Sequence, residues 1–226
     1  MNEFTPTKEM PVAKVDYRDP LIIEMVKGGV ALEFVAKTEE RLRDPITGLP
    51  DSRTCLAVMD RLLRDGIAVT VEFDDLLYLK TYNDLIGHPK TNEMLARIGE
   101  RFRKIETDLR EKGAKILIGR YAGDEFLKII IGLPPTEARQ VLDGVERELR
   151  HLEKPEGTLF RPHFSRGIAS STELRPGQTA GDLVALADQR AMEQKRGVKN
   201  KLRELAKRGG RNSAAAKFLR SVRRYG

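Results

Sequence analysis

The chain has 226 residues, of which 40% are hydrophobic and 33% are charged, which is enough apolar material for one core and excludes wholesale disorder. The mean hydropathy is −0.44, and no apolar run approaches the roughly 18 residues of a membrane span, so we expect no transmembrane segment and no secretory signal. A single cysteine, Cys55, excludes an intramolecular disulfide and a cysteine-based zinc site and favours a cytoplasmic setting.

The net charge of +7 is concentrated near the C-terminus. Nine Lys and Arg residues but one Glu fall within 201–225, so the rest of the chain is close to neutral. We therefore expect residues 204–226 to form a basic tail suited to an anionic partner, and we do not expect the main domain to bind nucleic acid through its overall charge.

Hydrophobic spacing and turn residues predict the elements in chain order. Residues 1–43 form a lead and a helix, which either supports dimerisation or packs on its own domain. A turn at 44–50 opens the main domain, 44–203. Its predicted elements are a helix at 51–63, a strand at 66–73, helices at 78–86 and 92–112, strands at 115–121 and 126–131, a helix at 135–152, a strand at 159–169 and a helix at 180–195.

This order of strands and helices is typical of a ferredoxin-like or palm domain. We therefore predict an α+β fold in which a mainly antiparallel sheet carries flanking helices on one of its faces.

Three acidic residues fall where the predicted strands bring them together. Asp75 ends the first strand, and Asp124 and Glu125 lie on the hairpin between the second and third strands. Converging carboxylates repel one another unless a cation neutralises them, and carboxylate oxygens suit Mg²⁺. The alternative is that Gly123 and Asp124 form an ordinary polar turn.

The residues around this hairpin decide between the two interpretations. The segment Arg120–Phe126 resembles the hairpin of the GGDEF domain, the catalytic module of diguanylate cyclases. Other segments are similar to the same family in order and spacing, over most of 44–200: Asp44–Pro50, Lys80–His88, Ser165–Ala169, Ala187–Asp188, Lys195 and Lys199–Asn200.

The resemblance implies that two GTP-loaded subunits of a homodimer condense their substrates into cyclic di-GMP and pyrophosphate. By position it implies that Asp75, the Leu76 carbonyl and Asp124 are ligands of Mg²⁺ or Mn²⁺. Glu125 is then a further metal ligand or the base for the 3′-hydroxyl.

The same resemblance assigns the substrate contacts. Asn83 binds guanine, Tyr78 lies near the nucleotide, and the backbone of Gly123 permits close approach. Lys80, Lys195 and Lys199 hold phosphates, as point charges suited to phosphate oxygens. The alternative for the last two lysines is that they belong to the basic tail.

Three positions depart from the family pattern. Ala122 replaces the first hairpin glycine, Leu77 replaces a strand-end aspartate, and Asn92 replaces a guanine-reading aspartate. They leave open a degenerate GGDEF module that binds a nucleotide or a protein partner without turnover. A third hypothesis, binding to nucleic acid or an anionic surface, rests on the tail alone.

The first strand also allows a second alignment. A gapped register would use Glu72 and Asp74 in place of Asp75.

Overall fold

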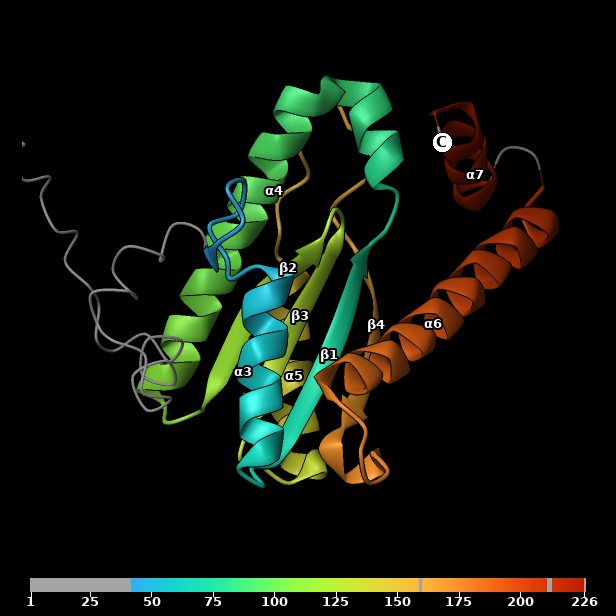
Figure 1. Ribbon diagram of the computed structural model, residues 1–226. Coiled ribbons are helices and arrows are strands. Elements are labelled where there is room, and N and C mark those ends of the chain that lie inside the picture. Colours follow the sequence, from blue (N-terminus) through green and yellow to red (C-terminus); the bar gives the residue numbers. More distant parts are fainter. Residues whose placement is uncertain (1–41, 159, 211–212, 226) are drawn as a thin grey trace, which may run out of the picture. The chain divides into compact units, whose positions relative to one another are not determined.

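The computed structural model describes residues 42–158, 160–210 and 213–225, all within one compact unit, Leu42–Gly226 (Figure 1). The lead and helix predicted over 1–43 therefore lie, except for the last two residues, outside the described residues. Within the described part, no helix has the length and apolar character needed to cross a membrane.

A four-stranded sheet forms the centre of the unit. Its strands are β1 (Val69–Leu76), β2 (Ile116–Ala122), β3 (Glu125–Ile131) and β4 (Phe164–Ser170), in the order β2-β3-β1-β4. Every neighbouring pair is antiparallel, and this is the strand order of a ferredoxin-like domain. The predicted α+β class is confirmed.

Helices cover both faces of the sheet, so the expectation of helices on one face was wrong. On one face lie α4 (Leu79–Glu111) and α5 (Pro135–Leu149), which share a core with alternate residues of β2 and β3. On the other lie α3 (Ser52–Arg64) and α6 (Ala180–Arg208), which contact β2, β1 and β4 (Figure 1). The reason is that successive strand residues point to opposite faces, and both sets are largely apolar.

The chain leaves β1 through a strained turn and enters α4, which is bent. Tyr78 adopts left-handed backbone angles, with φ of 68°, and is the one such non-glycine among the described residues. At Gly87 the angles are φ 78° and ψ 160°, so the two helices predicted over 78–86 and 92–112 are joined across a kink. Pro89 fits there because a proline near a helix start loses no intrahelical hydrogen bond.

The C-terminal segment folds back onto the domain. α6 does not end near residue 195 as predicted but continues through Arg208. Gly210, at φ 70°, ends it, and the Ser213 hydroxyl accepts from the Ala216 N–H to begin α7 (Ala214–Tyr225). α7 contacts α6 and α4. The boundary predicted at 203/204 thus falls inside α6.

A cluster of charges lies buried between the sheet and the α4/α5 layer. Lys128 Nζ is 2.5 Å from both Glu72 Oε1 and Asp74 Oδ2, and all three side chains are 0% exposed. Arg166 pairs with Glu72 from β4 and reaches Asp143 of α5. Burial raises the pKa of Asp74 to about 7, and neither of its oxygens makes a hydrogen bond of regular geometry.

Candidate functional site

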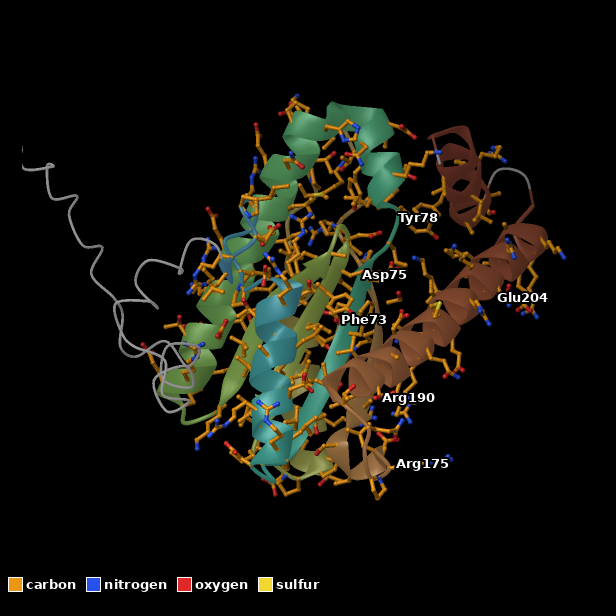
Figure 2. The ribbon with its side chains drawn as sticks, in the orientation of Figure 1. Phe73, Asp75, Tyr78, Arg175, Arg190 and Glu204 are labelled. Carbon is orange, nitrogen blue, oxygen red and sulfur yellow. The ribbon has the colours of Figure 1, made fainter. Side chains whose placement is uncertain are left out.

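The end of β1 and the tip of the β2–β3 hairpin meet. Asp75 is the cross-strand partner of Glu125, and the Leu76 N–H donates to the Asp124 carbonyl over 2.8 Å. The three predicted carboxylates thus come from adjacent backbone. Figure 2 shows Asp75 and Tyr78 near the end of β1 that leads into α4.

The alternative register would place the acidic residues elsewhere. Glu72 and Asp74 point away from Glu125 into the layer beneath α4 and α5, where both are fully buried against Lys128. Carboxylates held there have no access to a nucleotide. The geometry therefore favours Asp75 as the strand-end acid of the site.

Arg120 fixes the hairpin tip. It is 7% exposed, and its Nε and Nη2 donate to the Gly123 carbonyl over 3.1 and 2.6 Å. Gly123 has φ of 26°, a conformation that L side chains rarely adopt, so glycine is required there. Ala122 closes β2 without positive φ, so its replacement of the family's first glycine imposes no backbone strain.

A turn far away in sequence holds Arg120 in place. The Asp44 carboxylate accepts from the Thr47 N–H and hydroxyl, both over 2.7 Å, and from Arg120 Nη1 over 2.8 Å. Burial alone would raise the pKa of Asp44, but these hydrogen bonds hold it below its ordinary value of 3.8. The similarity of 44–50 to the GGDEF family thus has a structural reason, because this turn anchors the hairpin.

Close contact between β4 and α6 brings a lysine to the acidic residues. A Cβ on Gly167 would lie 2.0 Å from the Ala187 carbonyl oxygen, so only glycine allows this approach. Two turns along α6, Lys195 Nζ lies 2.7 and 2.6 Å from the two Asp75 oxygens. The sequence assigned the Lys195 ammonium to a substrate phosphate, whereas in the structure this ammonium binds the Asp75 carboxylate.

A fourth carboxylate, on Asp188, joins the group, and the sequence reasoning did not place it in the site. Burial raises the pKa of Asp124, Glu125 and Asp188, and repulsion from Asp75 raises each of them further. The available signal was its spacing, since Asp188 precedes Lys195 by seven residues and so shares its helix face. Asp75 pairs directly with the Lys195 ammonium, and the mutual repulsion of the four carboxylates favours an added cation.

The donor chemistry fits a divalent ion, although the side chains as placed do not enclose one. Among the described residues, no three His, Cys, Asp or Glu side chains converge closely enough to hold a metal. Carboxylate and carbonyl oxygens are the ligands that Mg²⁺ and Mn²⁺ prefer. Both Asp75 oxygens are bonded to Lys195, and its release would free them for a metal ion. The assignment of Asp75, the Leu76 carbonyl, Asp124 and Glu125 as metal ligands stays a prediction.

Beside the carboxylates lies a pocket of about 380 Å³. Five residues predicted for the site line it, and they come from the start of α4, the hairpin tip and α6: Tyr78, Lys80, Asp124, Lys195 and Lys199. The other lining residues are Leu79, Thr81, Arg203, Leu219 and Val222. Leu219 and Val222 belong to the segment 204–226, which the sequence predicted to be a basic tail, and Arg203 is the last residue of the predicted main domain.

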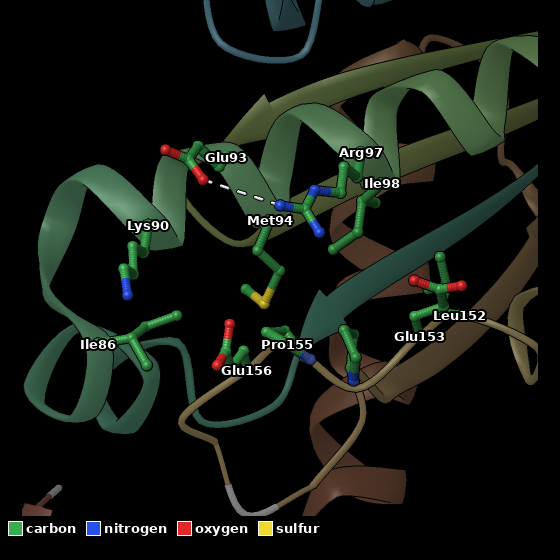
Figure 3. A pocket seen from close by; sticks show the side chains of 11 residues that line it. Ile86, Lys90, Glu93, Met94, Arg97, Ile98, Leu152, Glu153, Pro155 and Glu156 are labelled. Carbon is green, nitrogen blue, oxygen red and sulfur yellow. Dashed lines mark ion pairs between the residues drawn. The ribbon is translucent and has the colours of Figure 1, made fainter.

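Two predicted base-binding residues lie apart from this pocket. Asn83 is half-buried on the first part of α4, and Asn92 is exposed beyond the kink; neither lines the pocket. A second pocket, of about 250 Å³, lies along the later part of α4 and is drawn in Figure 3, where Arg97 pairs with Glu93 across 3.7 Å. None of the predicted site residues lines it.

Comparison with known proteins places this geometry in a family. The model of the family described as "Diguanylate cyclase, GGDEF domain" matches residues 41–201. Diguanylate cyclase DgcP of Escherichia coli K12 is 28% identical over 199 residues, covering 84% of this chain and 53% of that protein. Probable diguanylate cyclase DgcJ of the same organism is 26% identical, covering 68% of this chain and 29% of that protein. The chain therefore spans about half, or less, of these relatives.

Solved structures of GGDEF-domain proteins are also similar to this chain. Diguanylate cyclase SiaD of Pseudomonas aeruginosa, crystallised with its activator SiaC, is 29% identical with a TM-score of 0.61, covering 80% of this chain and 68% of that one. The coiled coil and GGDEF domain of DgcB from Caulobacter crescentus, in complex with c-di-GMP, has a TM-score of 0.60 at 18% identity, covering 81% and 96%, which shows the fold alone. With its sheet order, its acidic hairpin and a family match over more than half its length, this chain belongs to the GGDEF-domain family of diguanylate cyclases.

Proposed function

We propose that this domain is an active diguanylate cyclase that condenses two molecules of GTP into cyclic di-GMP and pyrophosphate in the cytoplasm. The observation that carries the proposal is the 380 Å³ pocket, in which lysines from α4 and α6 lie beside the hairpin carboxylate of Asp124. Phosphates need the cations, and a metal-assisted displacement needs the carboxylates.

Different residues of the chain bind the phosphates, contact the nucleotide and would hold the metal ion. Lys80, Lys195 and Lys199 bind the triphosphate, and Tyr78 lies against the nucleotide. Because Lys195 contacts Asp75, a phosphate bound at this ammonium would give it a second anionic partner and would release Asp75. Asp75, the Leu76 carbonyl, Asp124 and Glu125 would then hold Mg²⁺ or Mn²⁺. When bound, such an ion neutralises phosphate charge and favours attack at the α-phosphorus.

Proton transfer and base recognition complete the assignment. Glu125 accepts the proton of the attacking 3′-hydroxyl, since it stands at the first position of β3, opposite Asp75. Asn83 and Asn92 are the proposed guanine contacts, which requires the base to extend beyond the phosphate pocket, since neither residue lines it. The described residues supply one such group of lysines and hairpin carboxylates, so we infer that the second GTP is held by another copy of the chain and that the reaction requires a homodimer.

Incubation with GTP and Mg²⁺, followed by nucleotide chromatography, tests the proposal. We expect cyclic di-GMP and pyrophosphate from the wild type and none from Glu125→Gln. The matched control is Glu93→Gln, the same change at an exposed residue of α4 far from the pocket, which should leave turnover unchanged. Wild-type turnover in Glu125→Gln would contradict the role of that residue, and no product from the wild type would contradict the function.

A second candidate is a degenerate module that binds nucleotide without turnover. Leu77 favours it, because this residue stands where the family has a further strand-end aspartate and its side chain is only 7% exposed. If the domain is a degenerate module, GTP should bind and no product should form with any divalent ion. Titration of GTP alongside the turnover assay separates the two candidates. Binding of an anionic partner by the basic residues beyond 203 stays a prediction.

A further inference from the structure

The continuation of α6 adds a cation to the pocket. Lys195, Lys199 and Arg203 are spaced four residues apart, so they form one stripe along the helix. All three line the same pocket, together with Asp124. The family resemblance ends near Asn200, so nothing in it assigns a part to Arg203.

The guanidinium of Arg203 is available for an anionic ligand. Its Nη1 donates a 3.4 Å hydrogen bond to the Asn200 side-chain oxygen, and no carboxylate pairs with it within the described residues. Lys195, by contrast, is engaged by Asp75. Arg203 also lies near Tyr78, where its charge opposes the burial that raises the pKa of the Tyr78 hydroxyl.

α7 places apolar surface beside this stripe. Phe218 packs edge-on against Tyr78 and Phe160, at ring-centroid distances of 5.4 and 5.0 Å. This contact sets Leu219 and Val222 into the pocket wall. An apolar wall excludes water from one side of the stripe, and a charge–phosphate contact is stronger where water is excluded.

We propose that Arg203 is a fourth phosphate-binding residue of the nucleotide pocket, beside the apolar wall that the C-terminal helix α7 supplies. The inference rests on the proposed function, because it takes the ligand to be a nucleoside triphosphate. Arginine suits the task because its planar fork offers two parallel donors to phosphate oxygens. The segment beyond residue 200 is then part of the substrate site.

Equilibrium binding by the full-length chain tests the inference without turnover. The probe is a GTP analogue with a methylene group between the α- and β-phosphates, and GMP serves as the comparison. We expect Arg203→Gln to weaken binding of the analogue about tenfold and binding of GMP much less. Arg203→Lys, which keeps the charge but loses the fork, should fall between Arg203→Gln and the wild type.

The matched control is Lys201→Gln. It removes the same charge from α6, two residues from Lys199 and so on the opposite side of the helix, and its affinity should equal that of the wild type. If the wild type binds the analogue and Arg203→Gln binds it equally well, the inference is overturned while the proposed function stands. If the wild type binds neither nucleotide, both are overturned.

Discussion

Replacement of Arg120 with methionine removes the connection between the turn at 44–50 and the hairpin tip. Methionine fills a similar volume but donates no hydrogen bond. The Gly123 carbonyl would lose both bonds from the guanidinium, and Asp44 would keep only its two bonds from Thr47. The hairpin that carries Asp124 and Glu125 would then lose its support, so we expect both a less stable domain and weaker GTP turnover.

The structure sets the size of the effect. Breaking a buried ion pair costs about 3–5 kcal/mol, and the Asp44 side chain is 19% exposed, so water relieves part of that cost. We expect a loss of about 3 kcal/mol in the free energy of unfolding. For a domain of this size the melting temperature should fall by roughly 6–12 °C.

The pH dependence follows from the lowered pKa of Asp44. Its pKa in the folded state lies below the ordinary 3.8, so the stability it contributes is present above that value and is lost as the pH falls through the folded-state pKa. The difference between wild type and Arg120→Met should therefore be constant from pH 7 to 5 and should shrink below about pH 4.

Urea denaturation of the wild type, Arg120→Met, Asp44→Asn and the double variant measures the coupling between the two side chains. The two single changes should not add, because each removes the same pair. Arg120→Lys serves as the control, since it keeps the charge without the fork and should lose less. A destabilisation under 0.5 kcal/mol in Arg120→Met, or full additivity in the double variant, would refute the reasoning.

Three further predictions concern other parts of the domain. Gly167→Ala should destabilise by roughly 3 kcal/mol, because its Cβ would meet the α6 backbone; Gly144→Ala, whose nearest contact is 3.7 Å away, should be neutral or stabilising in the same melting assay. Glu125→Gln in metal-free buffer should be up to about 1 kcal/mol more stable than the wild type at pH 8, after allowance for solvent screening. The folded-state pKa of Glu125 is raised, so ionisation costs stability above that pKa, and the gain should vanish toward pH 4.5; a gain that grows on acidification would contradict this. Phe218→Ala should lower the free energy of unfolding by about 1–2 kcal/mol and weaken GTP binding, and wild-type values of both would exclude a structural part for α7.

Local patterns predicted much of this fold. The alternation in 66–73 and the Gly-Asp pair at 123–124 indicated a strand and a hairpin, because both depend on neighbouring residues. The coverage of both sheet faces was missed. Glu72, Asp74 and Lys128 give these strands a polar row that looks solvent-facing, whereas the residues bury one another's charge across strands. Pairing between distant segments leaves no local signal.

In the candidate site, too, some features could be predicted from the sequence and others could not. The positions of Asp75, Asp124 and Glu125 followed from the strand order. The ion pair between Lys195 and Asp75 did not, because the family pattern assigned Lys195 to phosphate. The return of α7 to the pocket did not, because it depends on how far α6 continues. A helix that crosses residue 200 without a break could not be inferred from a family pattern that ends there.

The buried cluster of Glu72, Asp74 and Lys128 bears on how the sheet assembles during folding. Lys128 lies directly across from Glu72 in the β1–β3 ladder. Because side chains alternate between faces, a slip of one residue would carry one strand's charges to the layer under α3 and α6 and leave the others unpaired. Each buried charge left without a partner would cost several kcal/mol of folding free energy, whereas the aliphatic residues of these strands would tolerate the shift. We therefore expect the cluster to fix the register of β1 against β3. A variant with apolar residues at all three positions can be folded and studied by amide hydrogen exchange. Its β1–β3 ladder should be less uniformly protected than that of the wild type.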